Sequence, residues 1–276
     1  MADNPDTEPD HGPGDPDAAP VGRGDLDRWA GQARELAAAG EYEEALRLHR
    51  RYFVTSRAFP ALYGVRLSFA LADWAELAAV YPPARRALEQ ARQEATDRLH
   101  AGSEHRHVPE NQRDPGQPAE PTPGDSFAEV EAISEALGEP DVALALFADL
   151  DARAPETAAE CSIVAHRLLV RSGRRDLARK YLGDPLRKVA RLADILQLRL
   201  ERGYAYLPEE KRDARRQEAV REYVAEVRDV LALLTGPDDA ELARRTLGHA
   251  VEAISWGHVR EEVSQGLADH PGQDAG

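Results

Sequence analysis

The sequence is short of cysteine, lysine and long apolar runs, and each shortage excludes a class of structure or site. A single cysteine, Cys161, among 276 residues excludes an intrachain disulfide and a cysteine-based metal cluster. No apolar stretch reaches the roughly 18 residues that a membrane-spanning helix needs. The N-terminus has no basic region followed by an apolar run, so we expect no signal peptide. These absences predict a cytoplasmic protein that does not bind membranes.

Catalytic motifs are also missing. The chain contains no HExxH, no GxSxG and no glycine-rich loop of the kind that cradles phosphate. Cys161 and His166 are five residues apart in a predicted helix, which places them about 140° apart around its axis, too far for a nucleophile and its base. Cys161 instead shares a face with Ala165 and Leu168, where an unreactive buried thiol is usual. The sequence therefore predicts no enzyme and no cofactor.

The charge balance is acidic. The formal net charge of −15 disfavours general nucleic-acid binding, because the phosphate backbone repels an acidic surface. Only three of the 35 basic residues are lysines, and alanine is abundant, a composition typical of GC-rich bacterial genomes. With 42% hydrophobic residues, the chain is long enough for one sizeable folded domain.

Some segments have no apolar periodicity and are rich in proline or charge. The segments of this kind, which we predict to be disordered, are 1–24, 101–124 and 257–276. The helical domain is then 25–256, interrupted by the second segment. A metal site near this insertion would use three histidines: His100, His105 and His107. Neither a cysteine nor a suitably spaced carboxylate completes such a site, so we expect a solvated loop.

The rest of the chain has the apolar spacing of paired helices. Before Gly40, apolar residues recur every three or four positions, starting at Leu26 and Trp29, and so share one helical face. Gly40 provides a left-handed helix end, and a second amphipathic helix begins at Tyr42. Further helices are predicted at 60–74, 73–80, 82–100, 125–138, 140–152, 156–172, 174–182, 184–203, 208–234 and 238–255. The pattern predicts an all-α fold.

These pairs resemble the tetratricopeptide repeat (TPR). The first pair has the motif residues Trp29, Ala33, Leu36, Gly40, Tyr42 and Ala45, whereas Gln32 and His49 replace the expected Leu and Phe. Two further copies match at Gly138, Ala143, Phe147 and Pro155, and at Leu169, Gly173, Ala178 and Leu182. Gly138 and Gly173 are 35 residues apart, close to the family's period of about 34. The resemblance implies a right-handed α-solenoid of about five antiparallel helix pairs that binds peptides or proteins.

In such a stack the first helix of each pair lines the concave groove. Six residues before the predicted turns at Gly40, Ala72 and Gly173 the sequence has arginine, and a fourth arginine lies one helical turn after the last of these. The predicted peptide-binding residues are these arginines and two neighbouring aromatic residues: Arg34, Tyr63, Arg66, Phe69, Arg167 and Arg171. Because guanidinium groups bind carboxylates bidentately, we expect an acidic peptide or a chain's C-terminus.

Three other interpretations remain. The protein could be an inhibitor, of the immunity type, of one cognate bacterial protein. It could instead self-associate through the apolar stripe on the 208–234 helix, which comprises Ala219, Tyr223, Val227, Val230 and Leu234. The acidic segment 1–24 could also occupy the basic groove until a partner displaces it.

Overall fold

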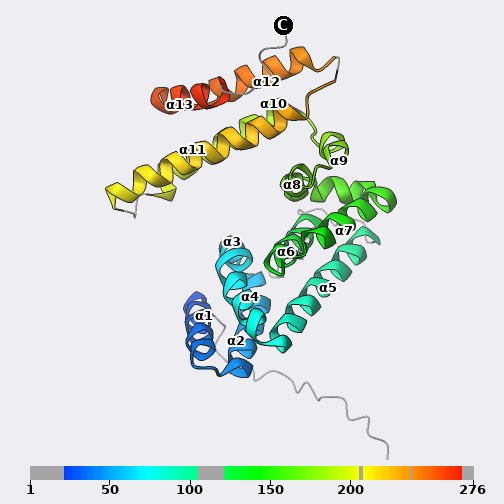
Figure 1. The fold of residues 1–276 in the computed structure, drawn as a ribbon, viewed down its shortest axis with the longest axis vertical. Coiled ribbons are helices and arrows are strands. Elements are labelled where there is room, and N and C mark those ends of the chain that lie inside the picture. The colour runs from blue at the N-terminus through cyan, green and yellow to red at the C-terminus, as the bar shows by residue number, and fades with distance from the viewer. Residues whose placement is uncertain (1–21, 105–120, 205–207, 237, 269–276) are drawn as a thin grey trace, which may run out of the picture. The chain divides into compact units, whose positions relative to one another are not determined.

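The computed structural model describes residues 22–104, 121–204, 208–236 and 238–268 (Figure 1). Over these ranges the chain is helical and contains no strand, so the all-α prediction is confirmed. It divides into two compact units, Met1–Ala91 and Arg92–Gly276. Most of the predicted disordered segments 1–24 and 101–124 lies outside the described residues.

The first unit is built from two α-helices followed by a less regular helical stretch. Its elements are α1 (Arg23–Ala38), α2 (Tyr42–Thr55), the 3₁₀ turns η1 (Ser56–Ala58) and η2 (Pro60–Leu62), α3 (Tyr63–Val65), the π-helix η3 (Arg66–Ala70), α4 (Leu71–Val80) and the start of α5 (Pro82–Glu104). Helix α1 packs against α2 around the buried side chains of Leu26, Trp29 and Leu48. The predicted hairpin is therefore present.

The predicted turn at Ala72 is wrong. Ala72 lies inside α4, and the chain from Tyr63 to Val80 is helical throughout, with a π-helical segment at 66–70. Residues 70–79 are alanine-rich and contain neither glycine nor proline, so nothing in them ends a helix. The helix ends at Tyr81, whose extended backbone suits a residue that precedes a proline. Pro82 then begins α5, as predicted.

The second unit contains the rest of α5 and eight further α-helices in the described part of the chain. They are α6 (Pro123–Ala136), α7 (Pro140–Arg153), α8 (Pro155–Arg171), α9 (Arg175–Lys180), α10 (Pro185–Leu198), α11 (Glu209–Ala232), α12 (Ala240–Glu252) and α13 (Gly257–Ala268), with a π-helix η5 (Arg199–Gly203) after α10. Helix α8 packs on α6 and α7, and α10 packs on both α11 and α12.

Three of the inter-helix turns have the same geometry. Gly40, Gly138 and Gly173 have φ values of 81°, 72° and 71°, which only glycine adopts without strain. In each turn the N–H after the glycine donates to the carbonyl five residues earlier, as in Glu139 to Ser134 at 2.7 Å. This is the Schellman arrangement, which satisfies the last carbonyls of the helix. The turns predicted at these three glycines are confirmed.

The prediction of disorder from residue 257 onwards is wrong as far as residue 268. These residues form α13, which packs against α11. Val259, Val263 and Leu267 are spaced four apart and are buried on one face, so this short helix has the apolar stripe that tertiary packing needs. Residues 269–276 lie outside the described chain.

The apolar stripe on α11 is buried within the second unit. Tyr223 and Val227 are 4% and 0% exposed, and α11 contacts α10, α12 and α13. The Tyr223 hydroxyl donates to the carbonyl of Ala250 at 2.7 Å. This stripe is used for intramolecular packing, and its residues are not presented on the surface for self-association.

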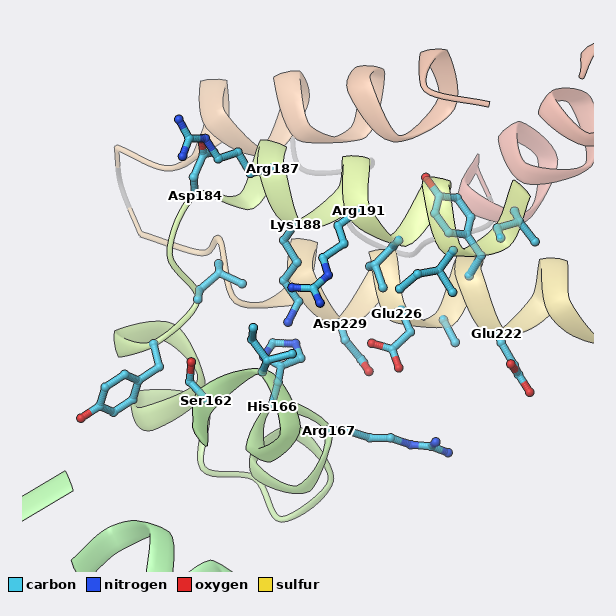
Figure 2. A pocket seen from close by; sticks show the side chains of 18 of the residues that line it. Ser162, His166, Arg167, Asp184, Arg187, Lys188, Arg191, Glu222, Glu226 and Asp229 are labelled. Atoms are coloured by element: carbon cyan, nitrogen blue, oxygen red, sulfur yellow. The ribbon is translucent and has the colours of Figure 1, made fainter. Parts of the chain in front are cut away.

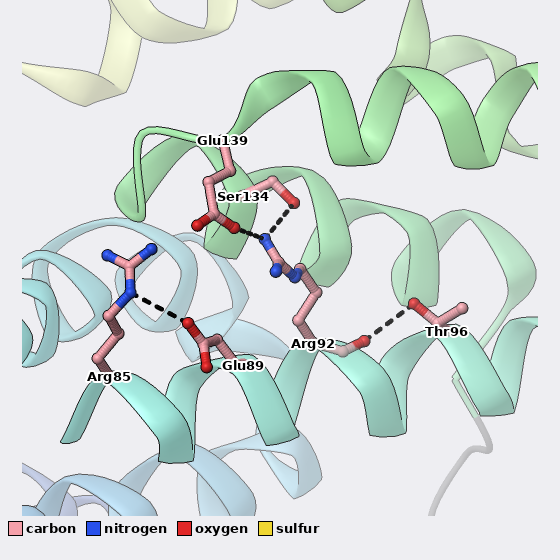
Figure 3. A network of polar contacts seen from close by, with 6 residues as sticks. All are labelled: Arg85, Glu89, Arg92, Thr96, Ser134 and Glu139. Atoms are coloured by element: carbon pink, nitrogen blue, oxygen red, sulfur yellow. Dashed lines mark hydrogen bonds and ion pairs between the residues drawn. The ribbon is translucent and has the colours of Figure 1, made fainter. Parts of the chain in front are cut away.

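The C-terminal part of α5 is joined to α6 and to the turn after it by ion pairs. Arg92 donates to Glu139 at 2.8 Å and to the Ser134 hydroxyl at 3.5 Å (Figure 3). Six residues further along α5, Arg98 contacts Glu129 at 2.6 Å, and the Glu129 side chain is only 1% exposed. These contacts cross from one helix to the next, whereas the Arg85–Glu89 pair in Figure 3 lies within α5.

Candidate functional site

The six residues of the predicted groove fall in both units. Arg34, Tyr63, Arg66 and Phe69 belong to the first unit. Arg34 is exposed and lies 3.5 Å from Asp73, and Phe69 is 75% exposed. These two side chains are available to a partner, as the prediction requires.

The prediction that Arg66 lines the groove is wrong, because this residue is only 3% exposed. Its guanidinium lies 4.9 Å from the centre of the Phe53 ring and 5.8 Å from that of Tyr63. The position of Arg66 in the groove was counted from a turn at Ala72 that does not exist. Arg66 therefore packs against aromatic rings in the interior, where its charge contributes a cation–π interaction.

Arg167 and Arg171 belong to the second unit and line one open cleft. The cleft has a volume of about 730 Å³ and lies between α8, α10 and α11 (Figure 2). Arg171 makes a bidentate ion pair with Glu135 at 3.2 and 3.4 Å. Arg167 makes no salt bridge with a carboxylate of the described residues. The structure thus places two of the six predicted residues together in a concave site.

Helix α10 provides the opposite wall of the cleft, because one of its faces packs into the core and another faces the cleft. Val189, Ala193 and Leu196 are buried on the side that packs into the core. Lys188, Arg191 and Ile195 belong to a second stripe that lines the cleft. This spacing of three and four residues keeps both stripes continuous along the helix.

The cleft combines exposed apolar surface with charge. Ile163 on α8 is 65% exposed and Ile195 on α10 is 41% exposed, and both line the cleft. Burying apolar side chains of this size is favourable, so large exposed ones often mark a surface that a ligand or another chain covers. An apolar segment that docks here would bury both.

Several charges around the cleft are already paired. Arg187 lies 3.6 Å from Asp184, and Arg199 lies 2.6 Å from Glu222. Lys188 and Arg191, like Arg167, have no salt bridge to a carboxylate in the described ranges. These three cations are therefore the ones that an incoming anion can neutralise.

Two carboxylates on α11, Glu226 and Asp229, face the same space as Lys188 (Figure 2). Burial lowers the pKa of Lys188, and the neighbouring Glu226 partly opposes this effect. Burial likewise raises the pKa of Asp229, which the positive charges of Arg167 and Lys188 oppose. The cleft is thus a partly desolvated site in which charges interact more strongly than on an open surface.

His166 lies at the floor of the cleft and is only 5% exposed. Burial, together with the nearby charge of Lys188, lowers its pKa to about 4, so the imidazole is neutral at pH 7. Cys161 is fully buried and burial raises its pKa to about 12. It does not line the cleft. The burial of Cys161 predicted from the sequence is confirmed, and its low reactivity stays a prediction.

The sequence did not reveal the contribution of α10 and α11. Lys188, Arg191 and Ile195 have the periodicity of a helix face, but that signal alone does not tell which neighbour the face meets. Only the packing of α10 beside α11 and opposite α8 brings this stripe to Arg167.

The described residues show neither a metal site nor a membrane-spanning helix. Among the described residues, no group of three or more His, Cys, Asp or Glu side chains is arranged to hold a metal ion. His105 and His107 lie outside those residues. No helix in the described ranges has the length and apolarity to cross a membrane. Comparisons with family models, curated proteins and solved structures gave no significant match for this chain.

Proposed function

We propose that this chain is a non-enzymatic interaction protein that binds a short acidic segment of a partner protein in the cleft between α8, α10 and α11. The observation that carries the proposal is the combination, in one cleft, of exposed isoleucines with cations that have no salt-bridge partner among the described residues. Ile163 and Ile195 offer apolar contact, and Arg167 and Arg191 offer guanidinium forks for carboxylates.

The size of the cleft supports a segment rather than a whole folded surface. Its volume of about 730 Å³ is within the range of sites that enclose a few side chains. Rigid helices position the cleft residues, so binding costs little ordering of the protein itself. The segment expected to bind carries one or two aliphatic residues close to aspartate or glutamate.

The turn geometry supports a TPR-like architecture for the same function. The three glycine turns share their φ sign and their hydrogen bonds, and each joins two helices: α1 with α2, α6 with α7 and α8 with α9. We propose that these pairs are repeats of a right-handed α-solenoid that acts as a cytoplasmic scaffold in a bacterium. Helical repeats commonly present binding surfaces of this type.

Peptide phage display against the immobilised full chain tests this function. The proposal predicts enrichment of peptides that combine acidic and aliphatic residues. An enriched peptide, labelled with fluorescein, should bind the Arg167→Glu/Arg191→Glu variant at least about tenfold more weakly, which corresponds to about 1.4 kcal/mol.

Arg221→Glu is the control for a charge reversal outside the cleft, because Arg221 is exposed on α11 and does not line the cleft. It should leave the affinity within about twofold. Absence of any enriched peptide, or equal weakening by both variants, would contradict the proposal.

A further inference from the structure

The floor of the cleft contains a buried histidine nitrogen without a hydrogen-bond partner. The Nε2 atom of His166 bonds to no polar atom of the described chain, although the side chain is only 5% exposed. Figure 2 shows the ring pointing from α8 into the cleft, with Lys188 extending from α10 towards it. Leaving a buried polar group unpaired destabilises the folded state, and folded proteins generally pair such groups.

His49 provides a useful contrast. Its Nε2 atom is also without a partner among the described residues, but its ring stacks on Trp74 at a centroid distance of 6.2 Å within the first unit. His166 instead lines an open cleft that a ligand can enter. Of these two nitrogens, only the one in the cleft is positioned to bind a ligand.

The charges around His166 indicate what kind of group would bind there. The charged residues that line the same cleft and make no salt bridge among the described residues are Arg167 on α8, Lys188 and Arg191 on α10, and Glu226 and Asp229 on α11. The cations exceed the carboxylates by one. A monoanion would balance this excess, whereas a phosphate dianion would add a second negative charge beside the two carboxylates.

We propose that His166 Nε2, the Lys188 ammonium and the Arg191 guanidinium together bind a single carboxylate of the ligand. The carboxylate is an acidic side chain or the C-terminal group of the segment, and the neutral imidazole donates through its Nε2–H. We call these three donors the carboxylate anchor. The anchor rests on the proposed function and deepens it, because it names the ligand group that the cleft selects. The exposed isoleucines then contact the residues next to that carboxylate.

NMR of the full chain with isotope-labelled histidine tests the anchor directly. Sodium acetate serves as the carboxylate probe at pH 7, with sodium chloride and sodium phosphate compared at the same ionic strength. The His166 imidazole signals should shift saturably with acetate, while chloride gives no saturation and phosphate saturates only at higher concentration. The His49 signals should stay unchanged, and His49→Gln assigns them without altering the cleft.

Substitutions identify the other two donors. Lys188→Gln/Arg191→Gln should abolish saturation of the His166 shift, and Arg221→Gln should retain it. Both positions in the double variant line the cleft and neither is part of the buried core, so the variant should fold. Its histidine spectrum also reports whether it is folded. The proposal would be overturned by a His166 signal that does not saturate with acetate. It would also be overturned by saturation that survives the double substitution, or by tighter binding of phosphate than of acetate.

The two proposals can fail separately. Selected peptides that still depend on Arg167 and Arg191, combined with a His166 signal insensitive to acetate, would sustain the function and remove the anchor. Saturable acetate binding in a protein that enriches no peptide would sustain the anchor and remove the function.

Discussion

At the residue scale, the buried titratable side chains are the ones whose protonation the fold controls most strongly. His49, Cys161 and His166 are each at most 5% exposed, and burial dominates the change in all three pKa values. Each group is held in its neutral form near pH 7, which limits its reactivity and makes stability depend on pH.

Cys161 should be unreactive in the folded protein. Burial raises the pKa of its thiol to about 12, and its sulfur lies 3.5 Å from the carbonyl of Pro123. Because the thiolate is the reactive form, labelling by a disulfide reagent at pH 8 should proceed only as the chain unfolds. Absorbance measured with and without guanidinium chloride checks this, and labelling of the native protein at the rate of a free thiol would contradict it.

His49 should make the protein sensitive to acid. Burial lowers its pKa to about 4 from 6.5, so between these values the unfolded chain binds a proton that the folded chain does not. Stability therefore falls as the pH falls through this window, by about 2 kcal/mol from pH 7 to pH 5 for this one group.

The variant His49→Leu should lose that share of the pH dependence, as measured by urea unfolding at pH 7 and pH 5. His258→Leu is the control, because His258 is exposed on α13. An unchanged difference between the two pH values in His49→Leu would show that other groups cause the acid sensitivity.

Residue burial could be predicted from the sequence where helical periodicity determines it. Cys161 shares a face with Ala165 and Leu168, and all three are buried. Arg66 could not be placed in this way, because its environment depends on the π-helical segment and on Phe53 from a different helix.

At the scale of elements, the ion pairs of α5 allow a buried and an exposed pair to be compared on one helix. Arg98 contacts Glu129, which is 1% exposed, whereas the Arg85 and Glu89 side chains are 43% and 40% exposed. Arg98→Met should destabilise the protein by about 2–3 kcal/mol, because the buried Glu129 carboxylate loses the guanidinium that it contacts. Arg85→Met should change the unfolding free energy by less than about 0.5 kcal/mol.

Urea denaturation of both variants measures the difference. The double variant Arg98→Met/Glu129→Leu should recover much of the loss, since both members of the ion pair are then removed together. Equal effects of the Arg85 and Arg98 substitutions would contradict the assignment of Arg98–Glu129 as the structural pair.

A side chain at the glycine of these turns should lower the stability of the protein. Gly138 has φ of +72°, so Gly138→Ala should destabilise the protein by about 1 kcal/mol even though nothing lies within 4 Å of the added methyl group. Gly248 lies inside α12 with similar free space, and Gly248→Ala should stabilise by about 0.5–1 kcal/mol through helix propensity. Thermal unfolding should give opposite signs, and a gain from Gly138→Ala would contradict the turn.

Elements were predictable where a local signal ends or starts a helix. Gly40, Gly138 and Gly173 mark turns, and Pro82 and Pro185 mark helix starts. Helix α13 was missed because three apolar residues in a polar segment specify a helix only once α11 provides a surface to bury them.

At the scale of the whole molecule, the sequence predicted one domain with a groove running through it. That predicted domain spans 25–256 and is interrupted by the 101–124 insertion. In the structure the chain has two compact units, and the cleft lies entirely in the second. Sequence periodicity identifies faces of helices but not which faces meet, so Arg167 could be named and its neighbours Lys188 and Arg191 could not. The predicted residues Arg34 and Phe69 of the first unit remain the alternative location for binding.

We propose that the cleft of the second unit, and not the surface of the first unit, binds the acidic segment. The most direct test is fluorescence anisotropy of one selected acidic peptide with four variants of the full chain. These are Arg167→Glu/Arg191→Glu in the cleft, Arg34→Glu and Phe69→Ala in the first unit, and the control Arg221→Glu. We expect at least about tenfold weaker binding for the cleft variant alone. Weakening by Arg34→Glu or Phe69→Ala, with the cleft variant unaffected, would contradict it and place binding in the first unit.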